Sequence, residues 1–265
     1  MTPEQYPRRL AEKEDRLRRF FTAHPRCAIA CSGGADSSYL WWAACRWGED
    51  CRAFYVSAAF QPAFELADAR RLAAELGRPL NVIELDVLSV PEAAANGPRR
   101  CYYCKKAIFT ALRQQAEAAG CSLLLDGNNA SDDASDRPGM QACRELEVLS
   151  PLRECGLTKS EIRRLSQAAG LFTWDKPSYS CLATRVAQDQ PLTRELLSRV
   201  EEGENLLRQL GFSDFRLRVR GEAALLQVTA GQQEQARRLL PEIQRLLAPL
   251  FSPVSLDPQA RKESL

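Results

Sequence analysis

Short apolar runs alternate with amphipathic stretches along the first half of the chain. The run 27–31 stops at Ser-Gly-Gly, and an apolar helical pattern follows at once from Tyr39. Further strands are predicted at 51–58, 80–85 and 122–125, and helices at 65–76 and 107–119. Strands that alternate with helices form βαβ units around a parallel sheet with helices on both faces. The pattern therefore predicts an α/β domain.

The order of elements changes past Gly170. The pattern there predicts a helix at 193–210, strands at 215–219 and 224–229, and a second helix at 232–247. A helix-strand-strand-helix order is typical of a smaller α+β domain. We therefore expect an α/β domain over 1–170, an α+β domain over 171–256 and a flexible polar tail over 257–265. Just before the boundary, Thr158 and Glu161 have the spacing of a capping box at the start of a helix.

Composition narrows the function classes. The 265 residues carry a net charge of +2, which favours neither a nucleic-acid nor a membrane partner. No apolar run reaches the roughly 20 residues that span a bilayer, and the polar N-terminal stretch has no signal-peptide core. We expect a cytoplasmic protein, in which the ten cysteines are thiols, ligands or reactants rather than disulfides.

The loop at 32–38 carries the clearest chemistry. Its glycines permit a sharp bend and close approach to a ligand, and the helix N-terminus that follows favours an anion. The loop lacks the lysine of the Walker A pattern, and Ser-Gly-Gly-x-Asp-Ser instead resembles the PP-loop of ATP pyrophosphatases, which release AMP and pyrophosphate. The residues expected to bind ATP or pyrophosphate here are Ser32, Gly33, Gly34, Asp36, Ser37 and Ser38.

Two more loops follow the carboxyl ends of predicted strands, where ligands bind in parallel sheets. The first begins at Ser57, and the second spans 126–131. We expect Ser57, Gly127, Asn129 and Asp132 to complete the nucleotide site.

A second informative block, Lys-Pro-Ser-Tyr-Ser-Cys-Leu-Ala-Thr-Arg, lies near the predicted domain boundary. Pro177 keeps the preceding residue out of the helical region, so Cys181 is expected on or just after a loop. Lys176 and Arg185 flank it with positive charge, which favours a thiolate. A cysteine beside a nucleotide site that activates acids suggests nucleophilic attack on an adenylate.

Taken in order, these blocks resemble the LarE family of ATP-dependent sacrificial sulfur transferases. The segments that carry the resemblance are SGGADSSYL, RCYYCKKAIFTAL, DGNNASDD with RPGM, GLTKSEIRRL and KPSYSCLATR. The resemblance implies a PP-loop domain of the HUP-like (adenine nucleotide alpha hydrolase) type. In the loop 126–138 of this chain, Asp132 fits the family pattern, whereas Ser135 and Asp136 depart from it. Arg137 falls in the same loop.

The resemblance also implies a mechanism. A carboxylate of a pyridinium dicarboxylate mononucleotide attacks ATP, with Mg²⁺ placed by Asp36, and pyrophosphate leaves. Cys181 displaces AMP as a thioester, and cleavage of its Cβ–S bond leaves a thiocarboxylate on the substrate and dehydroalanine in the chain. The family serves nickel-pincer cofactor synthesis for lactate racemase, which implies a downstream nickel-insertion protein. The family forms hexamers, so the resemblance also implies a homo-oligomer.

Cations that could meet this anionic substrate lie on the strand 215–221. Arg216, Arg218 and Arg220 alternate, so all three should project to one face, and guanidinium groups suit both phosphate and carboxylate. Together with Arg185 and Gln227, the first two are the expected substrate-binding residues. The family carries Glu where Gln227 stands and His where Arg220 stands.

The segment Cys101-Tyr102-Tyr103-Cys104 has the spacing of half a zinc site or a redox pair. The sequence shows no second pair, and the one histidine lies before the first strand. The resemblance instead places Arg100, Cys101, Cys104 and Lys105 in an active-site loop, and the metal ligands stay unassigned.

Three other functions remain open. A PP-loop tRNA thiolase would need an extended basic surface. A related sulfur transferase could hold a [4Fe–4S] cluster through Cys181 and two further cysteines. A non-enzymatic nucleotide-binding regulator is disfavoured by the intact loop residues.

Overall fold

The structure is a computed structural model that describes residues 5–132 and 138–262. Arg137, Ser135 and Asp136 lie outside this part. Contacts divide the chain into two compact units. The first comprises Met1–Ser57, Ala63–Leu85 and Cys101–Lys176, and the second comprises Ala58–Pro62, Asp86–Arg100 and Pro177–Leu265. The domain limits expected from the sequence stay a prediction.

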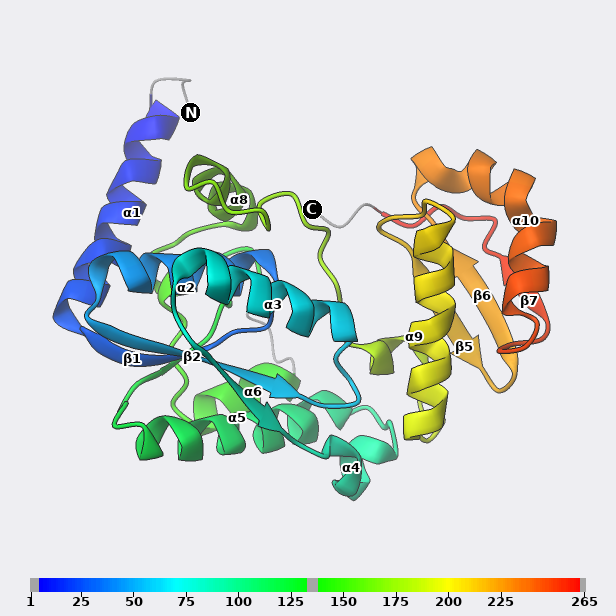
Figure 1. Ribbon diagram of the computed structural model, residues 1–265, viewed down its shortest axis with the longest axis horizontal. Helices are drawn as coiled ribbons and strands as arrows, with labels where there is room; N and C mark the ends of the chain where they lie inside the picture. Colours follow the sequence, from blue (N-terminus) through cyan, green and yellow to red (C-terminus); the bar gives the residue numbers. More distant parts are fainter. Residues whose placement is uncertain (1–4, 133–137, 263–265) are drawn as a thin grey trace. The chain divides into compact units, whose positions relative to one another are not determined.

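The first unit is built on a four-stranded, fully parallel sheet in the order β3-β2-β1-β4. The strands are β1 (Arg26–Ala30), β2 (Asp50–Ser57), β3 (Leu80–Glu84) and β4 (Leu124–Leu125). Cys27, Ala28 and Ile29 of the interior strand β1 are apolar and buried because both faces of such a sheet are covered. Figure 1 shows α2 and α3 over one face and α5 and α6 over the other. This arrangement confirms the α/β prediction.

Four helices of this unit, α2, α3, α5 and α8, were predicted from the sequence, whereas α1, α6 and α7 were not. The helices are α1 (Gln5–Ala23), α2 (Ala35–Trp47), α3 (Ala63–Leu76), α5 (Arg100–Ala118), α6 (Pro138–Glu145), α7 (Pro151–Glu154) and α8 (Lys159–Ala168). The polar N-terminal stretch is an amphipathic helix, because Leu10, Leu17 and Phe21 form a buried stripe. The capping box of Thr158 and Glu161 is confirmed at the start of α8.

The second unit contains a three-stranded sheet in the order β5-β6-β7. Its elements are η1 (Val87–Ser89), α4 (Pro91–Ala94), η2 (Leu182–Arg185), α9 (Arg194–Gln209), β5 (Arg216–Arg220), β6 (Ala223–Gln227), η3 (Ala230–Gln232), α10 (Gln233–Leu247) and β7 (Val254–Leu256). Strands β5 and β6 form an antiparallel hairpin, and β7 pairs in parallel with β6. The predicted helix-strand-strand-helix order is present, whereas the three-residue strand β7 was not predicted.

The tail expected from residue 257 is not free of the sheet. The Asp257 N–H donates to the Leu226 carbonyl, and the Arg261 N–H donates to the Val228 carbonyl. Backbone hydrogen bonds therefore hold Asp257 and Arg261 beside the end of β6, and the flexibility expected of the tail stays a prediction. Within the described ranges, no helix is long and apolar enough to cross a membrane.

Helix α9 packs closely on the second sheet at Gly203. A Cβ there would lie 2.7 Å from Cδ2 of Leu217, which is fully buried, and 3.4 Å from Cδ2 of Leu247. Gly203→Ala should therefore lower the free energy of unfolding by about 1 kcal/mol, since overpacking of about 1–3 kcal/mol exceeds the gain in helix propensity of about 1 kcal/mol. Urea unfolding measures this change. Gly231→Ala, with no atom within 4 Å of the added Cβ, is the control and should not lose stability.

Candidate functional site

The loop between β1 and α2 makes a turn that only glycine fits. Gly33 has φ +74°, and a Cβ there would lie 2.4 Å from the Glu65 carbonyl oxygen at the start of α3. Both the positive φ and the missing side chain are therefore needed. The turn sets the N-terminus of α2 directly after β1.

Serine hydroxyls tie this loop together. The Ser32 N–H donates to Oγ of Ser37 (3.1 Å), and the two hydroxyls lie 3.1 Å apart. The Ser38 hydroxyl donates to the Gly34 carbonyl (2.8 Å). These bonds fix the loop conformation and place hydroxyls and helix N–H groups at one point, which is a suitable cradle for an anion.

Asp36, in the first turn of α2, has two oxygens in different situations. Oδ2 accepts a hydrogen bond from Nζ of Lys159 (2.6 Å), whereas Oδ1 is buried with no hydrogen-bond partner among the described residues. Burial raises the pKa of Asp36 above its ordinary value of 3.8, and the cation of Lys159 offsets this only in part. A buried carboxylate oxygen without a partner is the kind of ligand that Mg²⁺ prefers, so the residues present fit that ion.

The loop after β4 forms a second side of the same place. A Cβ on Gly127 would lie 2.9 Å from the backbone nitrogen of Ser37, so this loop touches the N-terminus of α2. Asp132 accepts a hydrogen bond from the Asn129 N–H (2.8 Å), and its charge contributes to the raised pKa of Asp36. The structure thus brings Gly127, Asn129 and Asp132 together near the loop 32–38, and their role in nucleotide binding stays a prediction. Ser57 lies at the carboxyl end of β2.

Lys176 has a position that the sequence did not indicate. Its ammonium donates to the Gly33 carbonyl (2.9 Å) and pairs with Asp68 of α3. The structure places this cation on the Gly33 turn, and its expected effect on the thiol of Cys181 stays a prediction. Lys159 was missed as well, because its contact with Asp36 joins residues 123 positions apart.

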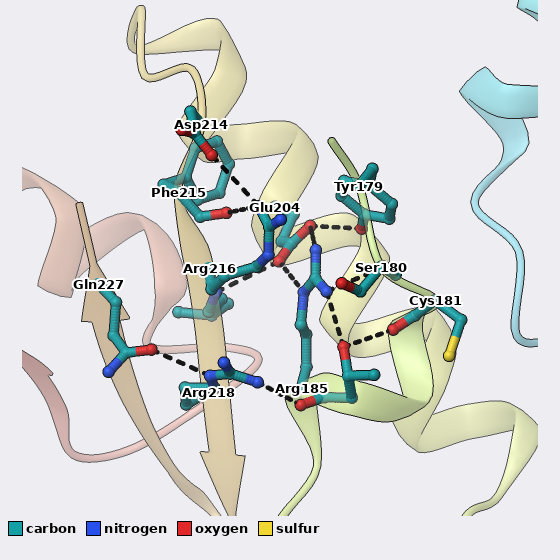
Figure 2. A network of polar contacts seen from close by, with 12 residues as sticks. Tyr179, Ser180, Cys181, Arg185, Glu204, Asp214, Phe215, Arg216, Arg218 and Gln227 are labelled. Carbon is teal, nitrogen blue, oxygen red and sulfur yellow. Dashed lines mark hydrogen bonds and ion pairs between the residues drawn. The ribbon is translucent and has the colours of Figure 1, made fainter. Parts of the chain in front are cut away.

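In the second unit, Cys181 precedes the short helix η2 and is held through its backbone. Its carbonyl accepts hydrogen bonds from the N–H (3.0 Å) and the hydroxyl (2.8 Å) of Thr184. The next residue, Leu182, donates its N–H to Phe60 (2.8 Å). Figure 2 shows the sulfur directed away from the polar network beside it. The cysteine is half-buried.

That network centres on Glu204 of α9, which the sequence analysis missed. Its carboxylate accepts from Nε of Arg185 (2.7 Å) and from the hydroxyl of Tyr179, and both charged side chains are 0 % exposed (Figure 2). Arg185 also donates to the Ser180 carbonyl (2.9 Å). One signal was present: a glutamate interrupts the apolar stripe that includes Val200 and Leu207.

The three arginines of β5 that were predicted to share one face differ in burial and in hydrogen-bond partners. Arg216 is buried and donates to the carbonyls of Phe215 and Ser178 (2.7 Å each), whereas Arg218 and Arg220 are exposed. Arg218 donates to Gln227 Oε1 (3.0 Å) and to the Thr184 carbonyl.

The uncharged amide at Gln227 has a carboxylate beside it. Gln227 donates to Oδ2 of Asp257 (2.7 Å) while its carbonyl accepts from Arg218. The amide therefore links a cation to a carboxylate supplied by the segment after β7. Roles of Arg185, Arg216, Arg218 and Gln227 in substrate binding stay predictions.

The segment expected to be an active-site loop forms the start of helix α5, so the expectation of a loop is wrong. Arg100, the first residue of this helix, belongs to the second unit, where it donates to Asn96 and to the Ala183 carbonyl (3.0 Å) in η2. Cys101 and Cys104 lie on α5 of the first unit. Lys105, on the same helix, contacts Sγ of Cys143 (3.9 Å). The structure assigns no chemistry to the two thiols.

An iron–sulfur cluster requires several ligands at one place. Over residues 5–132 and 138–262, no three His, Cys, Asp or Glu side chains come together in a way that could hold a metal ion. The described residues of one chain therefore do not fit a [4Fe–4S] centre at Cys181.

Comparison with known proteins identifies the family, although no protein-family model matches the chain. The chain is 32% identical over 205 residues to the pyridinium-3,5-bisthiocarboxylic acid mononucleotide synthase of Lactiplantibacillus plantarum, covering 77% of this chain and 74% of that protein. The chain belongs to the LarE family. It is also 36% identical over 228 residues to the uncharacterised protein slr1717 of Synechocystis sp., covering 85% of each. An uncharacterised Methanocaldococcus jannaschii protein, MJ0830, is 29% identical over 146 residues, covering 55% of this chain and 57% of that protein.

The raised pKa of Asp36 gives a test with a definite sign. A raised pKa means that the folded chain favours the protonated carboxyl of Asp36. The carboxyl therefore contributes fully to the free energy of unfolding below pH 3.8, and this contribution is lost as the pH rises through the pKa of the folded state. Asp36→Asn should therefore unfold at higher urea concentration than the unchanged protein at pH 7, and the difference should shrink toward pH 3.

Asp50→Asn is the matched control, because the exposed Arg52 lowers the pKa of Asp50 and the variant should gain nothing at pH 7. A less stable Asp36→Asn at pH 7 would mean that the Lys159 pair outweighs the burial of Asp36.

Proposed function

We propose that this chain is an ATP-dependent sulfur transferase that converts carboxylates of a pyridinium dicarboxylate mononucleotide into thiocarboxylates with the sulfur of Cys181. The observation that carries the proposal is the pairing of a lysine-free PP-loop with an anchored cysteine, in a chain related to a bisthiocarboxylic acid mononucleotide synthase. The first feature suits AMP and pyrophosphate chemistry. The second supplies the sulfur.

In the first step, a substrate carboxylate oxygen attacks the α-phosphorus of ATP, and the bond to pyrophosphate breaks. The serine hydroxyls and the N–H groups at the start of α2 hold the phosphates, and positioning carries most of such catalysis. Asp36 would hold Mg²⁺ through Oδ1, and the ion supplies charge neutralisation on the phosphates. Lys176 keeps the Gly33 turn in place through its carbonyl.

In the second step, the thiolate of Cys181 attacks the acyl carbon and AMP leaves. Loss of the Cα proton then breaks the Cβ–S bond, which leaves the sulfur on the substrate and dehydroalanine in the chain. Each chain can donate one sulfur, so a product with two thiocarboxylates consumes two chains.

The length of the connecting chain supports this assignment. Cys181 is five residues after Lys176, whose ammonium bonds to the PP-loop. Five residues span at most about 18 Å. The covalent chain therefore keeps the Cα atom of Cys181 within that distance of the Cα atom of Lys176, whatever arrangement the two units take.

A tRNA thiolase or a cluster-bearing enzyme would return its cysteines unchanged, so loss of sulfur separates the alternatives. After one round with Mg-ATP and pyridinium-3,5-dicarboxylic acid mononucleotide, the intact mass should fall by one H₂S. Peptide mapping should place dehydroalanine at residue 181, and AMP and pyrophosphate should be the nucleotide products.

Cys181→Ser should still release pyrophosphate in the presence of substrate but yield no thiocarboxylate, whereas Cys104→Ser should retain some sulfur transfer. Sulfur transfer with an unchanged protein mass would exclude the sacrificial step. ADP as the main nucleotide product would exclude the adenylation step.

A further inference from the structure

The C-terminal segment 257–261 contacts the arginine face of the second unit at two points. Asp257 bonds to the Gln227 amide, which faces Arg218. Arg261, whose N–H bonds to Val228 at the end of β6, reaches the turn before β5. The second contact bears on Arg216, because the carboxylate that Arg261 binds also lies near Arg216.

Arg261 binds Asp214 at both its backbone and its side chain. Nη1 donates to the Asp214 carbonyl (2.7 Å) and to the carboxylate. The pair is largely shielded, with 17 % of the Arg261 side chain and 13 % of the Asp214 side chain exposed. Asp214 has φ +33°, a backbone region that few residues other than glycine adopt. The surrounding contacts must therefore hold this turn in place.

The same carboxylate is the nearest ion-pair partner of Arg216, at 3.8 Å from Nη1 (Figure 2). That distance is longer than the 2.7–2.9 Å of a charge-assisted hydrogen bond. Arg216 instead donates to two neutral carbonyls. Its charge therefore has no hydrogen-bonded carboxylate among the described contacts, and the carboxylates of Glu204 and Asp214 offset it only from a longer distance.

The electrostatic surroundings agree with this description. Burial, followed by the cations of Arg185 and Arg261, lowers the pKa of Arg216 to about 10. Burial and the same two cations also lower the pKa of Arg218. The carboxylate of Glu204 opposes both effects without cancelling them, so a bound anion would stabilise the charged guanidinium groups further.

We infer that Arg261 is a positioning residue of an anion site at Arg216: by holding Asp214, it keeps that carboxylate from neutralising the guanidinium. Without Arg261, a movement of about 1 Å would bring Asp214 to hydrogen-bond distance from Arg216. The ligand class follows from the proposed function, as a mononucleotide that bears phosphate and carboxylate groups.

Binding of nicotinic acid mononucleotide, measured by calorimetry on the full chain, tests the inference. Arg261→Ala should weaken binding about tenfold, because Asp214 then competes with the ligand for Arg216. Arg261→Ala combined with Asp214→Asn should recover most of this loss, because no carboxylate remains to compete. Asparagine tolerates the positive φ at this position, and thermal unfolding checks that each variant is folded.

A control separates this effect from net charge. Arg261→Ala combined with Glu222→Gln has the same net charge as the rescuing pair, but Glu222 bonds to Arg199 and not to Arg216. It should bind as weakly as Arg261→Ala alone. Recovery in this control, or no recovery with Asp214→Asn, would overturn the inference, as would unchanged binding by Arg261→Ala or no binding by the unchanged protein.

Failure of the proposed function would look different. A chain that keeps its mass after sulfur transfer could still show the loss and rescue of binding described here. Conversely, the unchanged protein could lose H₂S while Arg261→Ala binds the mononucleotide as well as the unchanged protein does. That result would support the proposed function and exclude a positioning role for Arg261.

Discussion

The second unit depends on one buried carboxylate, that of Glu204. Removing a partner from a buried ion pair leaves an uncompensated charge and typically costs about 3–5 kcal/mol. Glu204 accepts from Arg185 in η2, from Tyr179 in the preceding loop and from the N–H of Leu217 in β5 (3.2 Å). Three segments are thus held in register by a single group on α9. The turn that carries Cys181 has its position because Arg185 cannot leave this carboxylate.

The first unit meets a different constraint, which is close approach. Two glycines, Gly33 and Gly127, leave no room for a Cβ, and each brings a loop against the backbone of a neighbouring helix. The result is a compact surface of N–H groups and hydroxyls around Asp36. Burial raises the pKa of this carboxylate, so its charged form lowers the stability of the ligand-free chain.

The sequence predicted those elements whose conformation depends mainly on neighbouring residues. The apolar runs placed β1, β2 and β3 correctly, and the Ser-Gly-Gly turn and the capping box follow from neighbouring residues. The strand predicted at 122–125 is present as the two-residue β4. The three-residue β7 was not predicted, because its pairing with β6, as at Ala224, is not encoded by any local period. The site divides in the same way: the loop residues were predicted, whereas the contacts of Lys159 and Arg261 join distant positions.

The anchoring of Cys181 has a consequence for the fate of the molecule. Its place is fixed by its own carbonyl and by the N–H of Leu182, groups that survive removal of the sulfur. Under the proposed chemistry, an exhausted chain would therefore keep its fold, and cellular surveillance that recognises unfolded protein would not distinguish it from a fresh one. Protein recovered from active cells would be a mixture of molecules that still carry the sulfur of Cys181 and molecules that have lost it, equal in size and shape. Its specific activity would report the age of the population.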